Sequence, residues 1–171
     1  MSEVVRVSAE WLALREPADA AARAAELVEE VRHHLGPARP VVIHDLGSGT
    51  GSMARWLAPR LPGAQHWIMY DRDADLLACA GTSMIDTAAD GAPVTVQTRQ
   101  RDITRLTGAD LAGAGLITAS ALLDMLTAEE LERVVAGCAA TGCPALLTIS
   151  VVGRVDLTPP DPLDAEIAEA F

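Results

Sequence analysis

The fold is decided by the stretch Val41-Val42-Ile43-His44-Asp45-Leu46-Gly47-Ser48-Gly49-Thr50-Gly51-Ser52. Its largely apolar first half predicts a buried strand, and the residues from Ser52 to Leu61 are compatible with a helix. Three glycines at alternate positions lie between the two. Because glycine lacks a Cβ atom, such a turn can adopt positive φ and lets a ligand approach the backbone closely. The helix that follows offers unpaired N–H groups, so the stretch predicts a ligand site at the carboxyl end of a strand.

The residues around the glycines separate two classes of ligand. A dinucleotide fingerprint counted from Gly47 needs its third glycine at position 52, where Ser52 stands. An acid, Asp45, lies two residues before Gly47, inside the strand end, where it can orient the loop and help to hold an ammonium group. The pattern Asp-Leu-Gly-Ser-Gly-Thr-Gly resembles the first motif of the class I S-adenosylmethionine-dependent methyltransferases. The resemblance implies S-adenosyl-L-methionine as cofactor, with S-adenosyl-L-homocysteine as product, and assigns cofactor contacts to Asp45, Gly47, Ser48, Gly49 and Gly51.

A second acid lies at the distance that this cofactor requires. Residues 66–70 predict a second strand, and Asp71 follows it, 20 residues beyond Gly51. Because the second strand lies beside the first, the Asp71 carboxylate can accept both hydroxyl hydrogens of an adenosine ribose. An alternative role is to cap the helix predicted over 74–88, and one residue can do both. Arg72 is expected along the adenine edge.

Further candidates follow the third and fourth predicted strands, residues 94–97 and 116–119. The resemblance implies that Asp102 accepts a hydrogen bond from the adenine amino group and that Ile103 packs on the ring. Ser120 is expected to contact the methionine part of the cofactor. Asp124 is the candidate for a catalytic group, and a helix-start acid is the favoured alternative. The sequence names no other catalytic base.

Strands that alternate with helices predict a doubly wound, mainly parallel Rossmann-like α/β sheet with helices on both faces. The predicted organisation is an N-terminal helical cap segment (1–40), a cofactor-binding core (41–152) and an incomplete proline-rich connection with the start of a helix (153–171). The family sheet has seven strands, and only five are predicted here. An apolar fifth strand over 144–152, buried on both faces, would form an open edge. We therefore expect either that the natural chain continues beyond residue 171, or that a second copy or a partner chain covers this edge.

The cap segment is predicted to contain one helix. Glu16-Pro17 is expected to start it, its body runs from Ala18 to Leu35, and Gly36-Pro37 ends it. The resemblance implies that such helices cover the cofactor, which makes Trp11, Arg15 and Arg23 candidates for contacts with the ligand. A tryptophan packed on the sheet and two solvated arginines are the favoured alternative.

Composition limits the possible functions. The 171 residues carry a net charge of −11, which opposes sequence-independent binding to nucleic acid. The three cysteines lack a Cys-x-x-Cys spacing, so no metal site is expected. The apolar runs are too short to span a membrane, and the first residues lack the layout of a signal peptide, so the expected location is the cytoplasm.

The resulting hypothesis is an S-adenosylmethionine-dependent methyltransferase that acts on a small-molecule acceptor. One alternative is a nicotinamide-dependent oxidoreductase, but the chain has no lysine, which excludes a lysine-assisted hydride mechanism. The other is a non-catalytic module that keeps the fold and serves as a cofactor-binding or scaffold subunit.

Overall fold

The computed structural model describes residues 7–35, 40–149 and 158–169. In chain order its elements are α1 (Ala9–Ala22), α2 (Leu27–His34), β1 (Val41–Leu46), α3 (Ser52–Leu57), η1 (Ala58–Arg60), β2 (Gln65–Asp71), α4 (Ala74–Ser83), β3 (Val94–Gln100), η2 (Ile103–Arg105), β4 (Leu116–Ser120), η3 (Leu123–Met125), α5 (Ala128–Ala139), β5 (Ala145–Thr148) and α6 (Asp164–Glu169).

The five strands form one parallel sheet in the order β3-β2-β1-β4-β5. The chain moves outward from β1 through β2 to β3, then returns to place β4 on the other side of β1. The strand order therefore reverses at β1 and β4. Ligands of open α/β sheets bind at this reversal, outside the carboxyl ends of the strands.

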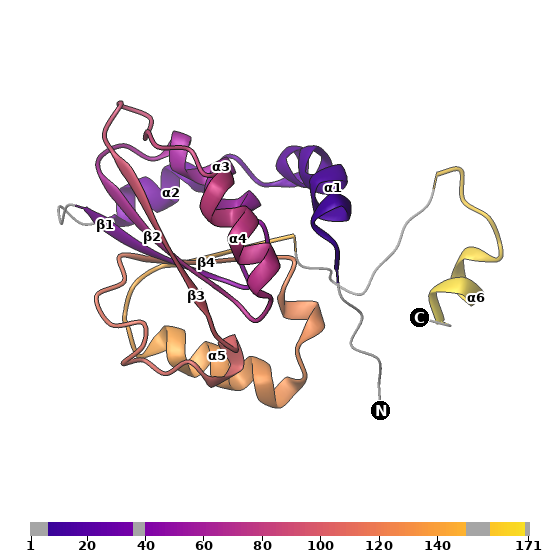
Figure 1. Ribbon diagram of the computed structural model, residues 1–171. Coiled ribbons are helices and arrows are strands. Elements are labelled where there is room, and N and C mark those ends of the chain that lie inside the picture. The colour runs from indigo at the N-terminus through magenta and orange to yellow at the C-terminus, as the bar shows by residue number, and fades with distance from the viewer. Residues whose placement is uncertain (1–6, 36–39, 150–157, 170–171) are drawn as a thin grey trace.

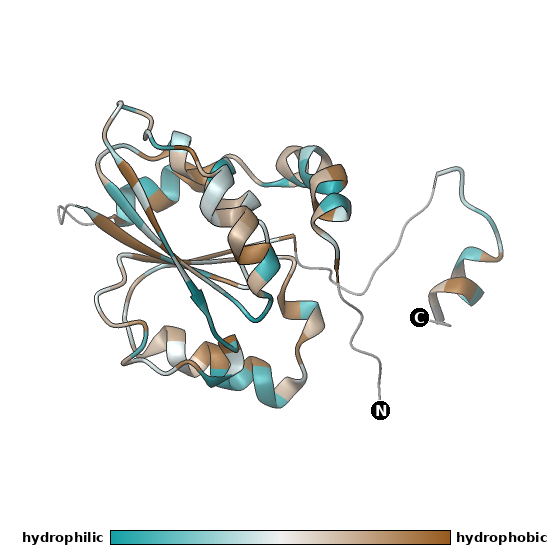
Figure 2. Ribbon diagram, viewed as in Figure 1, coloured by the Kyte–Doolittle hydropathy of each residue, from teal (hydrophilic) through white to brown (hydrophobic). Residues whose placement is uncertain are grey.

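Helices cover both faces of the sheet, as predicted (Figure 1). Alternate residues of each strand point to opposite faces. Ile43, Trp67 and Leu116 belong to the cluster that packs under α2, α3 and α4, and Leu46 and Ile117 belong to the cluster on the α5 side. Hydrophobic colouring follows the central strands between these layers (Figure 2). The predicted doubly wound α/β fold is confirmed.

The N-terminal helix prediction is wrong. The first helix begins at Ala9, where Ser8 accepts a hydrogen bond from the N–H of Trp11 (3.2 Å), and it passes through Pro17. It ends before Arg23, whose backbone is extended, and α2 is a separate helix. The prediction placed the helix start at Pro17, because proline favours the first turn of a helix. Here Pro17 lies inside α1, so the predicted start is too late in the chain. The expected helix stop at 36–37 lies outside the described residues.

The two N-terminal helices differ in their packing. The α1 helix has no buried residue, whereas Val28 and Val31 of α2 belong to the core under the sheet. Of these two helices, only α1 therefore lies outside the core, as a helix that covers the site would. The domain boundary at residue 40 stays a prediction.

The fifth strand was predicted to be buried on both faces, and this prediction is wrong. Leu146 and Thr148 of β5 are buried, but Ala145 is exposed and Leu147 is 44% exposed. β5 is one of the two edge strands of the sheet, so among the described residues it pairs with β4 alone. Residues 150–152 of the prediction lie outside the described part of the chain, as do residues 153–157 and 170–171 of the predicted C-terminal segment.

Smaller differences concern the ends of elements. The helix expected over 74–88 ends at Ser83, and the third strand continues to Gln100. The capping box at the start of α5 is present, because Glu130 N–H donates to Thr127 Oγ1 and Thr127 N–H donates to Glu130 Oε2 (2.9 Å). Within the described ranges, no helix has the length and apolar character needed to cross a membrane. No group of three or more His, Cys, Asp or Glu residues in these ranges is arranged so that it could hold a metal ion.

A core substitution tests the packing of α3 on the sheet. Leu57 is fully buried, so Leu57→Ala is expected to lower the free energy of unfolding by about 2–5 kcal/mol in urea denaturation. Leu14→Ala, at a residue that is 81% exposed, is the matched control and should change it by less than about 0.5 kcal/mol. Equal effects of the two substitutions would contradict this packing.

Candidate functional site

The glycine loop joins β1 to α3 in a tight turn. Gly47, Gly49 and Gly51 all have positive φ, at 64°, 53° and 85°. The N–H of Ser48 donates to the carbonyl of Tyr70 (2.9 Å), which ties the loop to β2. The positive φ of Gly47 favours glycine, and a Cβ atom there would lie 2.9 Å from Leu122 Cδ1, so the Leu122 side chain would have to shift.

The predicted ribose acid, Asp71, is part of this loop's support. It lies at the carboxyl end of β2 and is half-buried. One carboxylate oxygen accepts from the N–H of Gly49 (2.8 Å) and the other from the N–H of Asp73 (2.9 Å). A carboxylate oxygen has two acceptor sites, so each can still accept one further hydrogen bond from a ligand hydroxyl. The structure thus adds a positioning role to the role predicted for this residue.

The acid under the loop, Asp45, is almost fully buried, with 1% of its surface exposed. Thr118 of β4 donates its hydroxyl hydrogen to Asp45 Oδ1 (2.7 Å). Asp45 Oδ2 is buried and has no hydrogen-bond partner among the described residues. Burial raises the pKa of Asp45 to about 7, against the opposing effects of the Thr118 hydrogen bond and the Arg23 charge. This carboxylate therefore titrates near neutral pH and has one oxygen available to a ligand.

A buried cation faces the same region. Arg23, only 5% exposed, follows the last residue of α1, and its Nη2 donates to Ser52 Oγ (3.0 Å) and Ser120 Oγ (3.2 Å). Its guanidinium carbon lies 5.5 Å from the centre of the Trp56 ring. Its Nε and Nη1 are buried without partners among the described residues. Burial lowers the pKa of Arg23, while the charges of neighbouring acids, Asp45 included, raise it.

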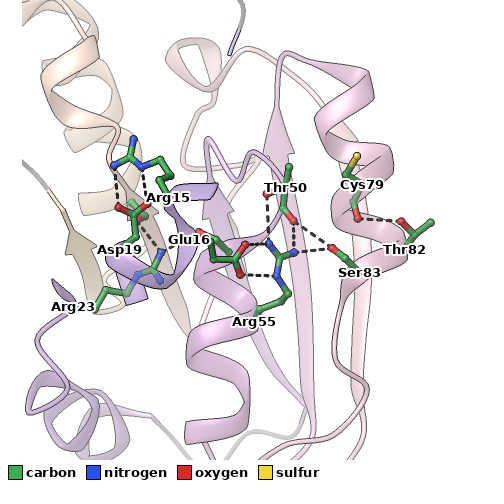
Figure 3. Close-up of polar contacts among 11 residues, drawn as sticks. Arg15, Glu16, Asp19, Arg23, Thr50, Arg55, Cys79, Thr82 and Ser83 are labelled. Carbon is green, nitrogen blue, oxygen red and sulfur yellow. Dashed lines mark hydrogen bonds and ion pairs between the residues drawn. The ribbon is translucent and has the colours of Figure 1, made fainter. Parts of the chain in front are cut away.

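The α1 helix is fixed across the glycine loop by a second arginine. Arg55 of α3 forms a bidentate ion pair with Glu16 of α1 (Figure 3). Arg55 also donates to the carbonyl of Thr50 and to Ser83 Oγ (2.7 Å). Leu12 of α1 approaches the loop to 3.4 Å from the position that a Cβ of Gly49 would take. The helix therefore lies directly over the predicted ligand site.

The other N-terminal candidates remain at the surface. Trp11 is 50% exposed, and Arg15 stacks on it at 4.8 Å while pairing with Asp19 (Figure 3). The favoured alternative of two solvated arginines is wrong for Arg23, because that side chain is buried at the strand ends. The sequence predicted neither the burial of the Arg23 guanidinium nor its contacts with Ser52 and Ser120.

The remaining predicted residues lie around the same end of the sheet but are not all in contact with the loop. Ser120, at the end of β4, is linked by Arg23 to Ser52 at the start of α3. Asp102 is exposed and caps η2 by accepting from Thr104 N–H (3.0 Å), and Ile103 is buried in the core on the α5 side. Arg72 and Asp124 are exposed, the latter on η3. Their roles stay predictions.

Two threonines were missed by the sequence analysis. Thr118 fixes Asp45, and Thr148 of β5 has a buried hydroxyl oxygen without a partner among the described residues. The signal was present, because each threonine is a polar residue in a mainly apolar strand, Thr118 in the middle of β4 and Thr148 at the end of β5. A buried hydroxyl needs a hydrogen-bond partner, and for Thr118 the neighbouring strand β1 provides it in Asp45.

Comparison with known proteins gives the family. A family described as "Methyltransferase domain" matches residues 43–143, which span the sheet from β1 to just before β5. A comparison with the curated proteins found no match.

Solved structures share the fold at low sequence identity. A putative S-adenosylmethionine-dependent methyltransferase from Listeria monocytogenes has a TM-score of 0.52 and 16% identity over 82% of this chain and 64% of its own. Magnesium protoporphyrin IX methyltransferase from Synechocystis PCC 6803, with bound SAH, has a TM-score of 0.54 and 17% identity over 99% of this chain and 70% of its own. Phosphoethanolamine N-methyltransferase 1 from Haemonchus contortus, in complex with phosphoethanolamine and S-adenosylhomocysteine, has a TM-score of 0.50 and 14% identity over 96% of this chain and 39% of its own.

The chain thus spans 64% of the length of the Listeria protein. The matched domain covers more than half of the chain and contains the glycine loop, Asp71 and the carboxyl end of β4. The chain belongs to the methyltransferase-domain family, and it shares its fold with S-adenosylmethionine-dependent methyltransferases.

Proposed function

We propose that this chain binds S-adenosylmethionine at the carboxyl ends of β1 and β4 and transfers its methyl group to a small-molecule acceptor. One observation carries the proposal. Arg23 Nε and Nη1, Asp45 Oδ2 and Ser48 Oγ are all buried without hydrogen-bond partners among the described residues. They belong to residues placed around the glycine loop. Buried polar groups of this kind are costly unless something bonds to them.

The amino-acid part of the cofactor fits these unpartnered atoms by charge. Its carboxylate would accept from Arg23 Nε or Nη1, and its ammonium would donate to Asp45 Oδ2, directly or through water. Ser48 Oγ supplies a further polar contact from the loop. A zwitterion satisfies a cation and an anion at once, which a simple anion or cation does not.

The adenosine part would extend toward β2 and β3. In this proposal Asp71 accepts from the ribose hydroxyls through the acceptor sites left by Gly49 and Asp73. Asp102 keeps its free acceptor sites for the adenine amino group, Ile103 contacts the ring from the core, and Arg72 lies along the adenine edge. Gly47, Gly49 and Gly51 let the ligand lie against the loop backbone.

The cofactor supplies a methyl group already activated on a sulfonium. In the transfer, a lone pair of the acceptor forms a bond to the methyl carbon, and the electrons of the sulfur–carbon bond return to sulfur. The task of the chain is to bind, to align and to exclude water, and α1 provides the cover. A proton lost by the acceptor would go to solvent or to Asp124, which is exposed beyond the carboxyl end of β4.

Net charge favours a small acceptor over nucleic acid, since 13 basic residues face 24 acidic ones. A cytoplasmic location stays part of this proposal. The nicotinamide alternative is not favoured, because the family match is to methyltransferases. A non-catalytic role would keep the same ligand site and lack turnover.

Calorimetric titration tests the ligand assignment. S-adenosylhomocysteine should bind, and NAD and NADP titrated in parallel should not. Asp71→Asn should weaken S-adenosylhomocysteine binding about tenfold or more, because the ribose loses a charged acceptor. Glu132→Gln on the exposed surface of α5 is the matched control and should bind like the unchanged protein. Binding of a nicotinamide cofactor, or equal binding by Asp71→Asn, would overturn the proposal.

The pH dependence of binding follows from the raised pKa of Asp45. An ammonium group favours the ionised carboxylate, and with a pKa of about 7 this form is lost as the pH falls through neutrality. The dissociation constant of S-adenosylhomocysteine should therefore rise about tenfold from pH 8 to pH 6. At pH 6, binding should release a proton, measurable by calorimetry in buffers of different ionisation enthalpy.

Two controls isolate this effect. Asp45→Asn should bind more weakly and without the pH dependence, and adenosine, which has no ammonium group, should show no pH dependence with the unchanged protein. A dissociation constant that stays constant from pH 6 to 8 would contradict the assigned role of Asp45.

A further inference from the structure

A polar cavity lies at the β2–β3 end of the sheet. It has a volume of about 360 Å³ and is lined by Tyr70 of β2, Arg99 and Gln100 of β3, and Arg101 and Asp110 beyond that strand. Each lining side chain carries a polar group, and the carboxyl-terminal part of β3 is hydrophilic (Figure 2). None of these five residues has a part in the proposed cofactor site.

Arg99 places a positive charge in this cavity. Its side chain is half-buried, its Nη1 donates to Tyr70 Oη (3.1 Å) and its Nη2 donates to Gln97 Oε1 (3.1 Å). Its guanidinium carbon lies 5.8 Å from the centre of the Tyr70 ring, which helps to hold the group in place. A guanidinium has five N–H donors, so three remain beyond these two bonds. No carboxylate among the described residues pairs with Arg99, so its charge is available to a ligand.

A second arginine lines the cavity and keeps it positive. Arg101 Nη2 donates to Asp110 Oδ1 (2.8 Å), and the Arg101 side chain is 57% exposed. Asp110 Oδ2 accepts from the N–H (2.9 Å) and the hydroxyl (2.8 Å) of Thr107. The charge of Asp110 is thus paired within the protein. Two arginines against one aspartate leave one net positive charge on the cavity, in a chain whose net charge is −11.

The Tyr70 hydroxyl fixes Arg99 from the buried side. Tyr70 is 1% exposed, and its oxygen lies 3.1 Å from Nδ1 of His44, which is also buried. The two rings stack with their centres 5.6 Å apart. Burial, followed by the charge of Arg99, lowers the pKa of His44 to about 4, so this ring is neutral near pH 7. A neutral His44 can accept the Tyr70 hydroxyl hydrogen, which leaves the oxygen lone pairs of Tyr70 for Arg99.

We propose that this cavity binds the phosphate group of a small molecule, with Arg99 and Arg101 as its cationic contacts and Tyr70 as the residue that positions Arg99. A phosphate carries close to two negative charges at neutral pH and accepts hydrogen bonds from several directions, so it pairs with both guanidinium groups. A single carboxylate is satisfied by one arginine. The inference is independent of the proposed function, because no residue that lines the cavity is assigned to S-adenosylmethionine.

The phosphate site would lie next to the proposed adenine edge. Gln100 Nε2 donates to the carbonyl of Arg72 (3.0 Å), and the N–H of Arg101 donates to the carbonyl of Asp71 (2.9 Å). Both contacts join the wall of the cavity to the end of β2 and the residue that follows it. The two ligands would therefore occupy neighbouring sites without sharing a residue.

Inorganic phosphate is the probe that tests this site. The full chain, isotope-labelled for NMR, is titrated with phosphate at constant ionic strength and about pH 8, where phosphate is mostly a dianion. The backbone amide signals of Arg99, Arg101 and Asp110 should shift and saturate with a millimolar dissociation constant, because the cavity carries only one net charge. Arg99→Gln should weaken phosphate binding about tenfold, since the phosphate loses a charge-assisted contact.

Arg105→Gln is the matched control. It removes the same charge from the same end of the sheet, but Arg105 is 86% exposed, pairs with Asp102 and does not line the cavity. Its phosphate affinity should stay within about twofold of that of the unchanged protein, because exposed charges are screened by salt. Acetate, which carries one charge, should bind to the unchanged protein about tenfold more weakly than phosphate.

Three outcomes would overturn the proposal. Equal phosphate affinities of Arg99→Gln and the unchanged protein would exclude Arg99 as a contact. Equal weakening by Arg99→Gln and Arg105→Gln would mean that phosphate is attracted by overall charge and has no site in the cavity. Equal affinities for acetate and phosphate would mean that one negative charge is enough. The far-ultraviolet circular dichroism of Arg99→Gln should match that of the unchanged protein, which separates loss of the site from loss of the fold.

Tyr70→Phe tests the positioning role by an independent measurement. The substitution keeps the buried ring and removes the hydroxyl that accepts from Arg99 Nη1. The side-chain Nε–H signal of Arg99 should move before phosphate is added, and the phosphate affinity should fall several-fold while the circular dichroism is preserved. An unmoved Arg99 signal together with an unchanged phosphate affinity would contradict the role given to Tyr70.

Discussion

The opposite charges of Asp45 and Arg23, both held inside the carboxyl end of the sheet, are the constraint on which the site depends. The two side chains are 1% and 5% exposed, and each keeps polar atoms without partners among the described residues. Burial of charge is unfavourable unless the charges are bonded. Thr118, Ser52 and Ser120 meet part of this need. In the function we propose, the amino-acid part of S-adenosylmethionine, which carries both charges, bonds to the remaining atoms.

The topology explains why these charges meet at one place. The strand order reverses at β1 and β4, so the crossover helices leave on opposite faces and the carboxyl ends of these strands are open between them. Asp45 comes from β1 and Thr118 from β4, while Arg23 arrives from the end of α1. The ion pair between Glu16 and Arg55 fixes that helix over the loop. A substitution in α1 would thus alter the proposed ligand site without changing a residue of the sheet.

Much of this fold could be predicted from the sequence, because local patterns determine it. The run ending at Leu46, the three glycines and the capping box at Thr127 each specify their structure within a few residues. Arg23 could not be placed in this way, since its burial depends on where α1 ends and on Ser120, 97 positions away. Nor could the exposure of Leu147, which follows from the position of β5 at the sheet edge. What the sequence missed depends on contacts between distant elements.

We propose that Arg23 recognises the amino-acid part of the ligand. This role is tested by comparing the affinities of S-adenosylhomocysteine and 5′-methylthioadenosine, which lacks that part, for the unchanged protein and for Arg23→Gln. The unchanged protein should prefer S-adenosylhomocysteine by about a hundredfold, and Arg23→Gln should reduce this preference about tenfold. Arg60→Gln, whose guanidinium stacks on the same Trp56 ring from an exposed position, should keep it. An unchanged preference in Arg23→Gln would contradict this role of Arg23.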